Sequence, residues 1–365
     1  MKYVFSIIIL IHGLIHLLGF IKGFNLTETN SLSQSISKPI GILWLLTFLL
    51  FLTTTATYIK NYKFWFVFAF ITLILSQILI LMFWKDAKFG TLANVLIFLV
   101  SLYAYGKFQF NNMVKNETKQ VLQHISAEKP SVILEKDLTH LPEIVQKWLK
   151  NSGVVGQEQS RFIRLKQIGE MRTKPEGKWM PFIAKQTFNV DEPAFVWDTE
   201  VEAMPLISLV GRDKLYQGKG SMLIKLAALI PVVNESKNKQ MNSGAMIRFL
   251  AEMCWFPSAA LNKYITWQAI GENSAKATLT IKDVSVFGMF RFSKDGDITS
   301  FEAQRYYGGN TTSKLETWRV NMTSYKTFHG IKIPNKNSVC WKLKEGDFNW
   351  LNLEILAVDR VITEN

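Results

Sequence analysis

Two histidines one helical turn apart, inside a long apolar run, are the residues of this sequence whose spacing first suggests chemistry. In the stretch "IHGLIHLLGFIKGF", residues 11–24, His12 and His16 stand at i and i+4. On a helix they share one face, where two imidazoles could supply two ligands of a zinc ion or bind a haem iron. Either centre needs a further ligand, so the surrounding elements decide between a metal site and a packing role.

Four apolar runs in the first third of the chain are each long enough to cross a membrane. A helix needs about 20 apolar residues to span a hydrocarbon layer about 30 Å thick. The four runs cover residues 5–21, 40–59, 64–84 and 91–108. The first run continues without the small residues of a cleavage site, so we expect it to remain attached as a span.

Charge divides the chain after the fourth run. Residues 1–111 contain eight Lys, no Arg and two acids, whereas residues 112–365 contain 34 basic and 27 acidic residues. This contrast predicts a four-helix transmembrane region at 1–111, a polar juxtamembrane linker at 112–138 and a soluble domain at 139–365. The net charge of +13 is diffuse and lacks clustered Arg and aromatic residues, so nucleic acid is not an expected partner.

The lysines at the ends of the spans predict their orientation. An even number of spans places both termini on one side, and cytoplasmic loops carry the excess of Lys and Arg. The side of the termini holds Lys2, Lys60, Lys63, Lys107, Lys115 and Lys119, and the opposite side holds Lys22, Lys38, Lys85 and Lys88. This small bias predicts a multi-pass protein of the bacterial cytoplasmic membrane with a cytoplasmic soluble domain; a periplasmic domain is the alternative.

The spans offer hydrogen-bonding partners to the two histidines but no third metal ligand. The four runs contain no Asp, Glu, Cys or further His, so we expect neither metal nor haem, and no cofactor. Matching depths along the helices places Gln77 and Asn94 near His16, and Ser101 near His12. These five residues predict an intramembrane polar seam between packed helices. The alternative is a proton relay or a substrate contact, because ionisable groups inside a membrane are often functional.

Alternation of apolar and polar residues predicts that the soluble domain is mostly antiparallel strand. In "AFVWDTEVEA", residues 194–203, apolar positions alternate with acids. Similar runs cover residues 161–171, 179–190, 275–282, 285–293, 298–307, 314–325, 338–344 and 348–358. Before them, residues 138–156 predict an amphipathic helix with Pro142 in its first turn and Gly153 at its end.

A helical insert is predicted to interrupt the strands at residues 222–261. It comprises an apolar stretch at 222–233 and an amphipathic stretch at 243–261, which Pro257 ends. So many antiparallel strands around one helical segment favour a strongly curved sheet, or half-barrel, whose concave side the helix fills. We therefore predict an α+β soluble domain with a concavity suited to an apolar ligand.

Four segments of the soluble domain resemble an uncharacterised bacterial family that carries a domain of unknown function. They are "RDKLYQGKGSM" (212–222), "RFLAEMCWFPSAAL" (248–261), "ATLTI" (277–281) and "GIKIPNKNSVCWKLKEGDFNWLNLEI" (330–355), and the resemblance spans roughly residues 139–360. No activity comes with this family. The stretch from Tyr325 to Pro334 is also similar to the half-barrel of Lol-type lipoprotein carriers, where a curved sheet holds acyl chains beneath a helical lid.

The candidate ligand-binding residues lie on the insert and on one strand. Arg248 and Glu252 are four residues apart on a helix, where they form a surface ion pair or, if turned inward, a grip for a polar head group. The other candidates are apolar or aromatic: Trp255, Phe256, Trp197 and Met222.

Common enzyme motifs are not met in the soluble domain, and no catalytic residue is predicted. "GKGSM" lacks the second glycine of a nucleophile elbow, and Gly218 and Gly220 lack the rest of a phosphate-binding loop. Cys254 and Cys340 are separate and have no metal-site spacing. An enzyme acting on a lipid would have to use Arg248, Glu252 and His329.

These observations favour a membrane-anchored binding protein for an apolar or lipid-like ligand. The spans would serve as the anchor and as a surface through which a homo-oligomer could form. The alternatives are a membrane-bound enzyme that acts on such a ligand, and a signalling or scaffold module whose soluble domain docks a protein.

Overall fold

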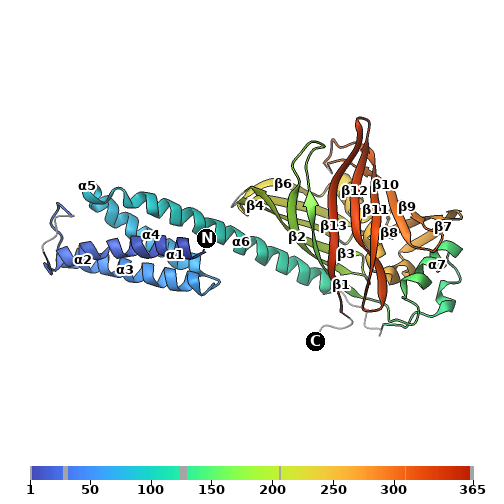
Figure 1. Cartoon of the computed structure of the whole chain (residues 1–365), viewed down its shortest axis with the longest axis horizontal. Helices are drawn as coiled ribbons and strands as arrows, with labels where there is room; N and C mark the ends of the chain where they lie inside the picture. The colour runs from blue at the N-terminus through green and yellow to red at the C-terminus, as the bar shows by residue number, and fades with distance from the viewer. Residues whose placement is uncertain (1, 28–31, 124–129, 205–206, 309, 362–365) are drawn as a thin grey trace. The chain divides into compact units, whose positions relative to one another are not determined.

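The computed structural model describes residues 2–27, 32–123, 130–204, 207–308 and 310–361 (Figure 1). The chain divides into two compact units, Met1–Asn111 and Asn112–Asn365. The first is helical, and the second is built around one β-sheet.

Four helices among the described residues are long and apolar enough to cross a membrane, at Lys2–Gly23, Lys38–Ile59, Trp65–Met82 and Gly90–Leu122. Their positions agree with the four predicted runs. His16 divides the first of them, because its amide bonds to the Gly13 carbonyl three residues back rather than four. The helices are α1 (Lys2–Ile15), α2 (Leu17–Gly23), α3 (Lys38–Ile59), α4 (Trp65–Met82), α5 (Trp84–Ala87) and α6 (Gly90–Leu122).

Glycines on the first span let it pack closely against α3. A Cβ atom at Gly19 would lie 2.1 Å from the Trp44 ring, and one at Gly13 would lie 2.6 Å from Phe51 Cβ. Both distances are shorter than van der Waals contact, so a larger residue at either position would push the helices apart. The face that carries these glycines is therefore a helix-packing face.

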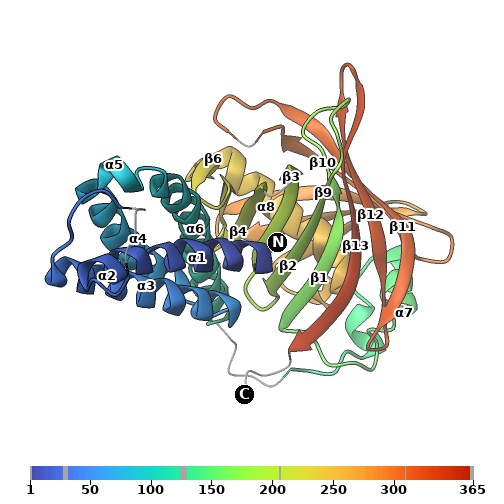
Figure 2. The same ribbon diagram turned by 60° about the vertical axis from the view of Figure 1, so that its left-hand side comes forward.

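The second unit is a sheet of 13 strands in the order β6-β5-β4-β3-β2-β1-β13-β12-β11-β10-β9-β8-β7, and all neighbouring pairs run antiparallel. The sheet curves strongly but does not close, since β6 and β7 remain at its edges (Figure 2). This confirms the predicted curved antiparallel half-barrel with a helical insert. The strands are β1 (Phe162–Met171), β2 (Met180–Asn189), β3 (Ala194–Met204), β4 (Ile207–Tyr216), β5 (Lys219–Leu226), β6 (Ile230–Ser236), β7 (Ile265–Gly271), β8 (Ser274–Ile281), β9 (Val284–Phe292), β10 (Ile298–Tyr306), β11 (Leu315–Phe328), β12 (Ile331–Leu343) and β13 (Gly346–Val361).

Helix α8 (Lys239–Glu252) lies in the concave side of this sheet (Figure 2). It begins at Asn238, whose side chain accepts a hydrogen bond from the Met241 amide at 2.6 Å. The helix packs against β4–β6 on one limb of the sheet and against β8–β10 on the other. It therefore joins the two limbs that the curvature brings toward each other.

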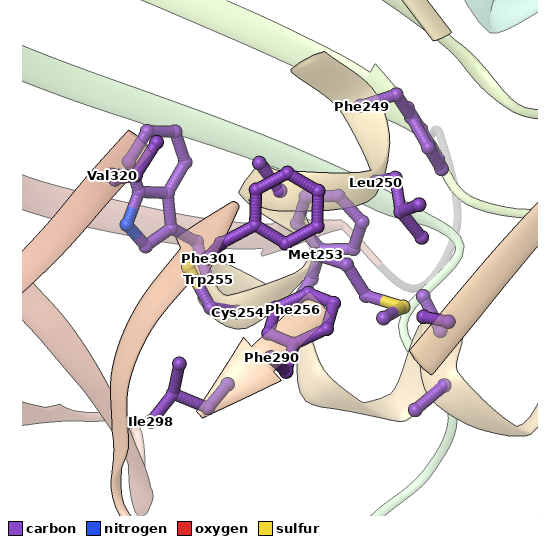
Figure 3. Close-up of a cluster of buried hydrophobic side chains, with 14 of the residues drawn as sticks. Phe249, Leu250, Met253, Cys254, Trp255, Phe256, Phe290, Ile298, Phe301 and Val320 are labelled. Atoms are coloured by element: carbon purple, nitrogen blue, oxygen red, sulfur yellow. The ribbon is translucent and has the colours of Figure 1, made fainter. Parts of the chain in front are cut away.

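The core of the second unit lies between α8 and the sheet (Figure 3). Two short helices follow α8, η2 (Met253–Trp255) and η3 (Pro257–Leu261). Phe249 and Phe256 lie with ring centroids 5.5 Å apart, and Phe290 and Phe301 from the opposite limb lie 4.8 Å apart. All four side chains are buried, so the predicted helix of the insert is present over 239–252 as a core element.

Residues 222–233, predicted to be helical, form a β-hairpin instead. They belong to β5 and β6. The connection contains two residues with left-handed backbone, Ala227 with φ +50° and Ala228 with φ +58°, which turn the chain back on itself. An apolar run of this length does not distinguish a buried helix from a strand, and β-branched residues such as Ile224 and Val233 favour the strand.

The predicted linker at 112–138 begins as helix, because α6 continues to Leu122. Within the second unit, Glu117 on this helix forms ion pairs with Arg212 at 2.9 Å and with Lys214 at 2.8 Å. The helix end is thus fixed to β4 on the face opposite α8. Residues 124–129 of the predicted linker lie outside the described residues.

Helix α7 (Glu143–Ser152) is the amphipathic helix predicted after the linker. It begins at Pro142 and ends at Gly153, whose φ of +79° suits a glycine cap. Its Trp148 packs against Trp267 and Phe290 of the sheet, so its apolar face completes the core on that side.

Candidate functional site

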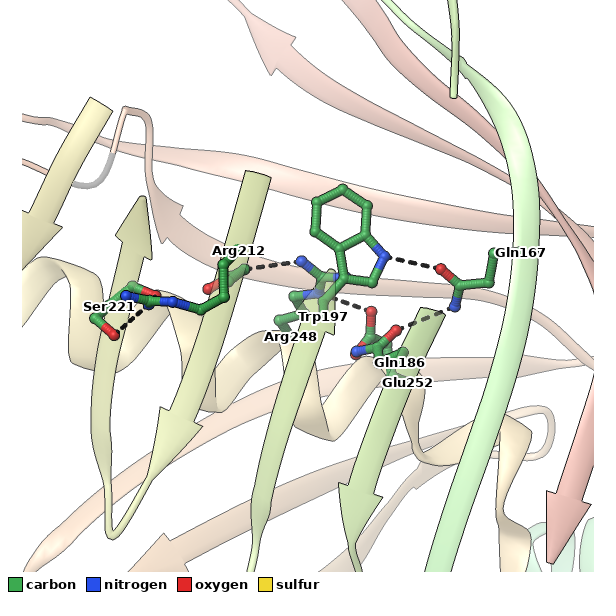
Figure 4. Close-up of polar contacts among 8 residues, drawn as sticks. Gln167, Gln186, Trp197, Arg212, Ser221, Arg248 and Glu252 are labelled. Carbon is green, nitrogen blue, oxygen red and sulfur yellow. Dashed lines mark hydrogen bonds and ion pairs between the residues drawn. The ribbon is translucent and has the colours of Figure 1, made fainter. Parts of the chain in front are cut away.

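Arg248 joins α8 to the sheet through two ion pairs (Figure 4). Its Nε donates to Glu252 Oε1 at 2.7 Å, and its Nη1 donates to Asp213 Oδ2 on β4 at 2.8 Å. The side chain of Arg248 is 16% exposed and that of Asp213 only 2%. The predicted pair of Arg248 and Glu252 is therefore turned inward, where a second acid joins it.

Hydrogen bonds extend these ion pairs along the sheet. Gln186 Nε2 donates to Glu252 Oε2 at 2.7 Å, and Gln167 Nε2 donates to Gln186 Oε1 at 3.1 Å. Trp197 Nε1 donates to Gln167 Oε1 at 2.9 Å, as Figure 4 shows. The guanidinium carbon of Arg248 lies 4.7 Å from the centroid of the Trp197 ring, so the contacts form a closed loop that begins and ends at Arg248. We call this group the concave network: Gln167, Gln186, Trp197, Asp213, Arg248 and Glu252.

Strand register brings these residues together. Gln186 on β2 lies opposite Trp197 on β3. Trp197 lies opposite Asp213 on β4, and Asp213 lies opposite Met222 on β5. Residues directly opposite each other in antiparallel strands share a face of the sheet, so half-buried Met222 faces α8 beside Asp213. The predicted binding residues that the fold brings into one group are Trp197, Met222, Arg248 and Glu252.

Burial and charge shift the protonation equilibria of this group. Burial raises the pKa of Glu252 above its usual value, although Arg248 and Gln186 oppose that shift. Burial lowers the pKa of Arg248, but Glu252 and Asp213 outweigh it and hold this pKa above its usual value. Arg248 thus contacts both carboxylates in a place where an unpaired charge would be costly, and the charge of Arg305 interacts with both carboxylates as well.

A second arginine, Arg305 on β10, lies beside α8 on the same side of the sheet. A Cβ atom at Gly244 of α8 would lie 3.2 Å from Arg305 Nε. The guanidinium lies 4.8 Å from the centroid of the Trp318 ring and 5.9 Å from that of Trp341. Among the described residues, Arg305 forms no ion pair or hydrogen bond, and buried Trp318 Nε1 has no hydrogen-bond partner either. Burial lowers the pKa of Arg305 to about 10.

The concave face beside the network is apolar. Phe182, Val201 and Leu209 lie opposite one another on β2, β3 and β4. Each is four residues along its strand from a member of the network and so shares the network's face. Half-buried Met171 and Met180 continue this surface toward the β1–β2 turn. Phe182 and Val201 are 3% and 4% exposed and belong to the core, whereas Leu209, Met171 and Met180 are half-buried. The concave side thus places a partly covered apolar patch next to a group of charges.

Trp255 and Phe256, predicted to line a ligand site, lie in the core instead (Figure 3). They are 4% and 2% exposed. Trp255 Nε1 donates to the Pro334 carbonyl at 3.1 Å, and the Phe256 ring lies 4.7 Å from that of Phe188. The cavity beside them measures about 10 Å³, room for about one water molecule. The short helices η2 and η3 hold both side chains against the sheet, which gives them packing positions.

In the first unit, the two histidines bond to two neighbouring helices. His12 Nε2 lies 2.9 Å from Asn94 Oδ1 on α6, and His16 Nε2 lies 3.0 Å from Ser76 Oγ on α4. His16 Nδ1 lies 2.9 Å from the His12 carbonyl, to which it must donate. The Ser76 hydroxyl also lies 3.1 Å from Asn94 Oδ1, and its single proton can be donated to only one of Asn94 Oδ1 and a neutral His16 Nε2.

The remaining residues of the predicted seam divide into two cases. Gln77 joins the network, because Asn94 Nδ2 donates to Gln77 Oε1 at 2.9 Å. Ser101 does not, because its hydroxyl donates to the Ile97 carbonyl of its own helix at 2.8 Å. Gln77 and Asn94 also line an apolar groove of about 610 Å³ between α4 and α6, together with Thr91, which accepts from Gln77 Nε2 at 3.2 Å.

Metal-ligating and nucleophilic side chains are scattered in the fold. No group of three or more His, Cys, Asp or Glu among the described residues could hold a metal ion. Cys254 and Cys340 are buried free thiols, and burial raises the pKa of each. His329 lies in the β11–β12 turn and bonds to the Val358 carbonyl at 3.0 Å. The fold therefore brings neither cysteine nor His329 to the concave network.

Several residues of both networks were missed in the sequence. Asp213 and Arg305 are charged residues at inward positions of strands whose other inward positions, such as Leu215 and Ala303, are apolar. The available signal was a charged residue at a strand position where the alternation of the sequence leads us to expect an apolar one. Ser76 gave none, because its partner His16 is 60 residues away in the sequence.

The fold and the site together define a class of protein: a group of apolar helices followed by a curved antiparallel half-barrel, with a helix held in its concave side by buried ion pairs. The chain belongs to the family described as "Family of unknown function (DUF6920)", whose model matches residues 139–359. This confirms the family resemblance predicted over 139–360. No curated protein matches the chain.

Solved structures with a similar fold include two bacterial proteins. A LolA superfamily protein from Nitrosomonas europaea is 10% identical with a TM-score of 0.34, over 60% of this chain and 93% of that one. A DUF1329 family protein from Desulfovibrio piger is 8% identical with a TM-score of 0.32, over 65% of this chain and 96% of that one. The Lol-type likeness expected from Tyr325–Pro334 is thus found, and at these values it concerns the fold alone.

Proposed function

We propose that the protein is a membrane-anchored binding protein for an apolar or lipid-like ligand, which lies against the concave face of the sheet. The observation that carries this proposal is the patch of half-buried Leu209, Met171 and Met180, backed by the core residues Phe182 and Val201, beside the concave network. An apolar surface with a few convergent polar groups is the usual composition of a small-molecule site. Charged residues on the concave side would fix one end of the ligand, and the apolar residues would hold its chain.

The anchor in this proposal is the set of four apolar helices. Their length and composition suit a hydrocarbon layer, and their polar side chains bond to one another through His12, His16, Ser76 and Asn94. The sheet would then work close to a bilayer that supplies apolar ligands. The excess of Lys on the side of the termini favours a cytoplasmic position for the sheet.

Photocrosslinking of the full chain in lipid nanodiscs tests the proposal. The probe is a diacylglycerol with a diazirine in one acyl chain, and mass spectrometry locates the labelled peptides. We expect label on the peptides that contain Phe182, Val201 and Leu209, in addition to label on the apolar helices. Label confined to residues 1–111 would refute a ligand site on the sheet.

Matched variants distinguish ligand binding at the concave face from nonspecific labelling of the protein surface. Leu209→Glu places a charge on the concave surface and should abolish labelling of the sheet. Ile183→Glu is the control, since Ile183 is next to Phe182 on β2 but is 62% exposed on the other face. It should leave the labelling unchanged. Equal effects of the two variants would contradict the proposed position of the ligand.

A further inference from the structure

We infer that Arg305 and Trp318 form an oxyanion subsite, so that the apolar ligand of this protein carries an anionic head group, a carboxylate or a phosphate. This inference rests on the proposed function and adds to it the chemistry of the ligand's polar end. An Arg guanidinium has five N–H donors in a planar fork that matches either oxyanion. Within the described part of the chain, none of these donors is used.

Two independent observations identify these donors as unfilled. Arg305 is half-buried on the face of Trp318 and forms no hydrogen bond or ion pair within the described part of the chain. Trp318 is 4% exposed, and its Nε1 is a buried donor without an acceptor among the described residues. Buried polar groups are nearly always hydrogen-bonded, so the unfilled Trp318 N–H, next to an arginine without a hydrogen bond, points to an acceptor that comes from outside the chain.

Each acid nearby has at least one oxygen bonded, although Asp213 Oδ1 has no hydrogen-bond partner among the described residues. Asp213 Oδ2 and Glu252 Oε1 accept from Arg248 at 2.8 and 2.7 Å. Their charges act on Arg305 from a distance and help to hold it in the concavity, but neither lies within ion-pair distance of it. Arg248 is thus a structural cation with two partners, and Arg305 is a cation with its donors free.

The position of the subsite fits an amphiphile. Trp318 on β11 lies opposite Trp341 on β12, which lies opposite Phe348 on β13. These three rings form an apolar row that leads from Arg305 toward the centre of the sheet. These side chains are 4%, 7% and 3% exposed, so an acyl chain attached to a head group at Arg305 would enter the packing above this row rather than lie on an open surface.

Three photoactivatable probes that carry the same diazirine-labelled hydrocarbon chain test the inference on the full-length protein in phosphatidylcholine nanodiscs at pH 8. They are a fatty acid, the matching fatty alcohol, and a phosphatidic acid. We expect the sheet of the wild-type protein to be labelled at least about tenfold more efficiently by an anionic probe than by the alcohol, because hydrogen bonds to charged groups are the stronger ones. Whether the fatty acid or the phosphatidic acid labels better distinguishes a carboxylate from a phosphate ligand.

Variants assign the preference to the subsite. Arg305→Gln should remove it and leave labelling by the alcohol unchanged, whereas Arg291→Gln, at an arginine 56% exposed on β9, should retain it. Trp318→Phe keeps the ring and removes only the N–H, so it should lower the preference severalfold even if Arg305→Gln does not fold. Equal labelling of the wild-type sheet by all three probes would overturn this inference and leave the proposed function standing. No labelling of the sheet by any probe would overturn both.

Discussion

Replacement of Arg248 by Met tests whether the concave network holds α8 on the sheet. The substitution keeps most of the aliphatic volume but leaves Asp213 and Glu252 buried without their cation. Removing one partner of a buried ion pair usually costs about 3 to 5 kcal/mol, because the remaining charge stays desolvated. Arg305 also attracts both acids, so we expect the lower end of that range, about 3 kcal/mol.

The same variant should acquire a pH dependence of known sign. Burial already raises the pKa of Glu252 in the wild-type protein, and loss of Arg248 removes the attraction that opposes it. A carboxyl whose pKa is higher in the folded than in the unfolded state binds its proton more tightly when folded. Stability is then greatest below the unfolded pKa and falls as the pH rises through the folded pKa. The deficit of Arg248→Met should therefore be larger at pH 8 than at pH 5.

Thermal unfolding followed by tryptophan fluorescence at pH 5 and pH 8 measures both effects. The control is a variant that also carries Asp213→Asn and Glu252→Gln, which removes the two uncompensated charges and keeps the hydrogen-bonding shapes. It should recover most of the lost stability and show little pH dependence. A loss below about 1 kcal/mol, independent of pH, is the size expected of solvated ion pairs and would refute the buried network.

Other predictions concern the helices, the core and the topology. His16→Asn keeps a hydrogen-bonding group for Ser76 and should preserve resistance to unfolding in SDS, whereas His16→Leu should lower it by about 0.6 to 2 kcal/mol; stoichiometric haem or metal in the purified protein would contradict the packing role. Trp255→Ala should cost about 3 to 5 kcal/mol by calorimetry, with unchanged lipid per folded molecule, as for a core residue. A reporter fused after Asn365 should be active in the cytoplasm; periplasmic activity would reverse the orientation.

Local patterns predicted the elements of this fold better than the contacts between them. Alternation along single strands located most of β1 to β3 and β8 to β13, because each strand has one buried face. It missed β4 and β7, for which no run was predicted. It also missed β5 and β6, whose apolar residues fit a helix equally well until the turn at Ala227 and Ala228 is known. The curvature could be inferred only from the number of strands around one helix.

The candidate site shows the same limit at the level of side chains. Arg248 and Glu252 could be paired from their spacing, because both lie on one helix. Asp213 could not be added, since its distance from Arg248 depends on how β4 faces α8. Trp255 and Phe256 were large and apolar, which fits a pocket wall and a core equally, and only the packing of η2 and η3 decides for the core.

Strand β4 contacts the end of α6 and helix α8 through two adjacent residues. Arg212 faces one side of the sheet and forms an ion pair with Glu117 at 2.9 Å, whereas Asp213 faces the other side and binds Arg248 at 2.8 Å. Neighbouring residues on a strand point to opposite faces, so a slip of one residue in the register of β4 would exchange these charges and break both pairs. The order of Arg212 and Asp213 therefore specifies the register of β4. Because Arg212 and Asp213 are adjacent, a movement of Asp213 away from α8 would also displace Arg212, which is paired with Glu117 of α6.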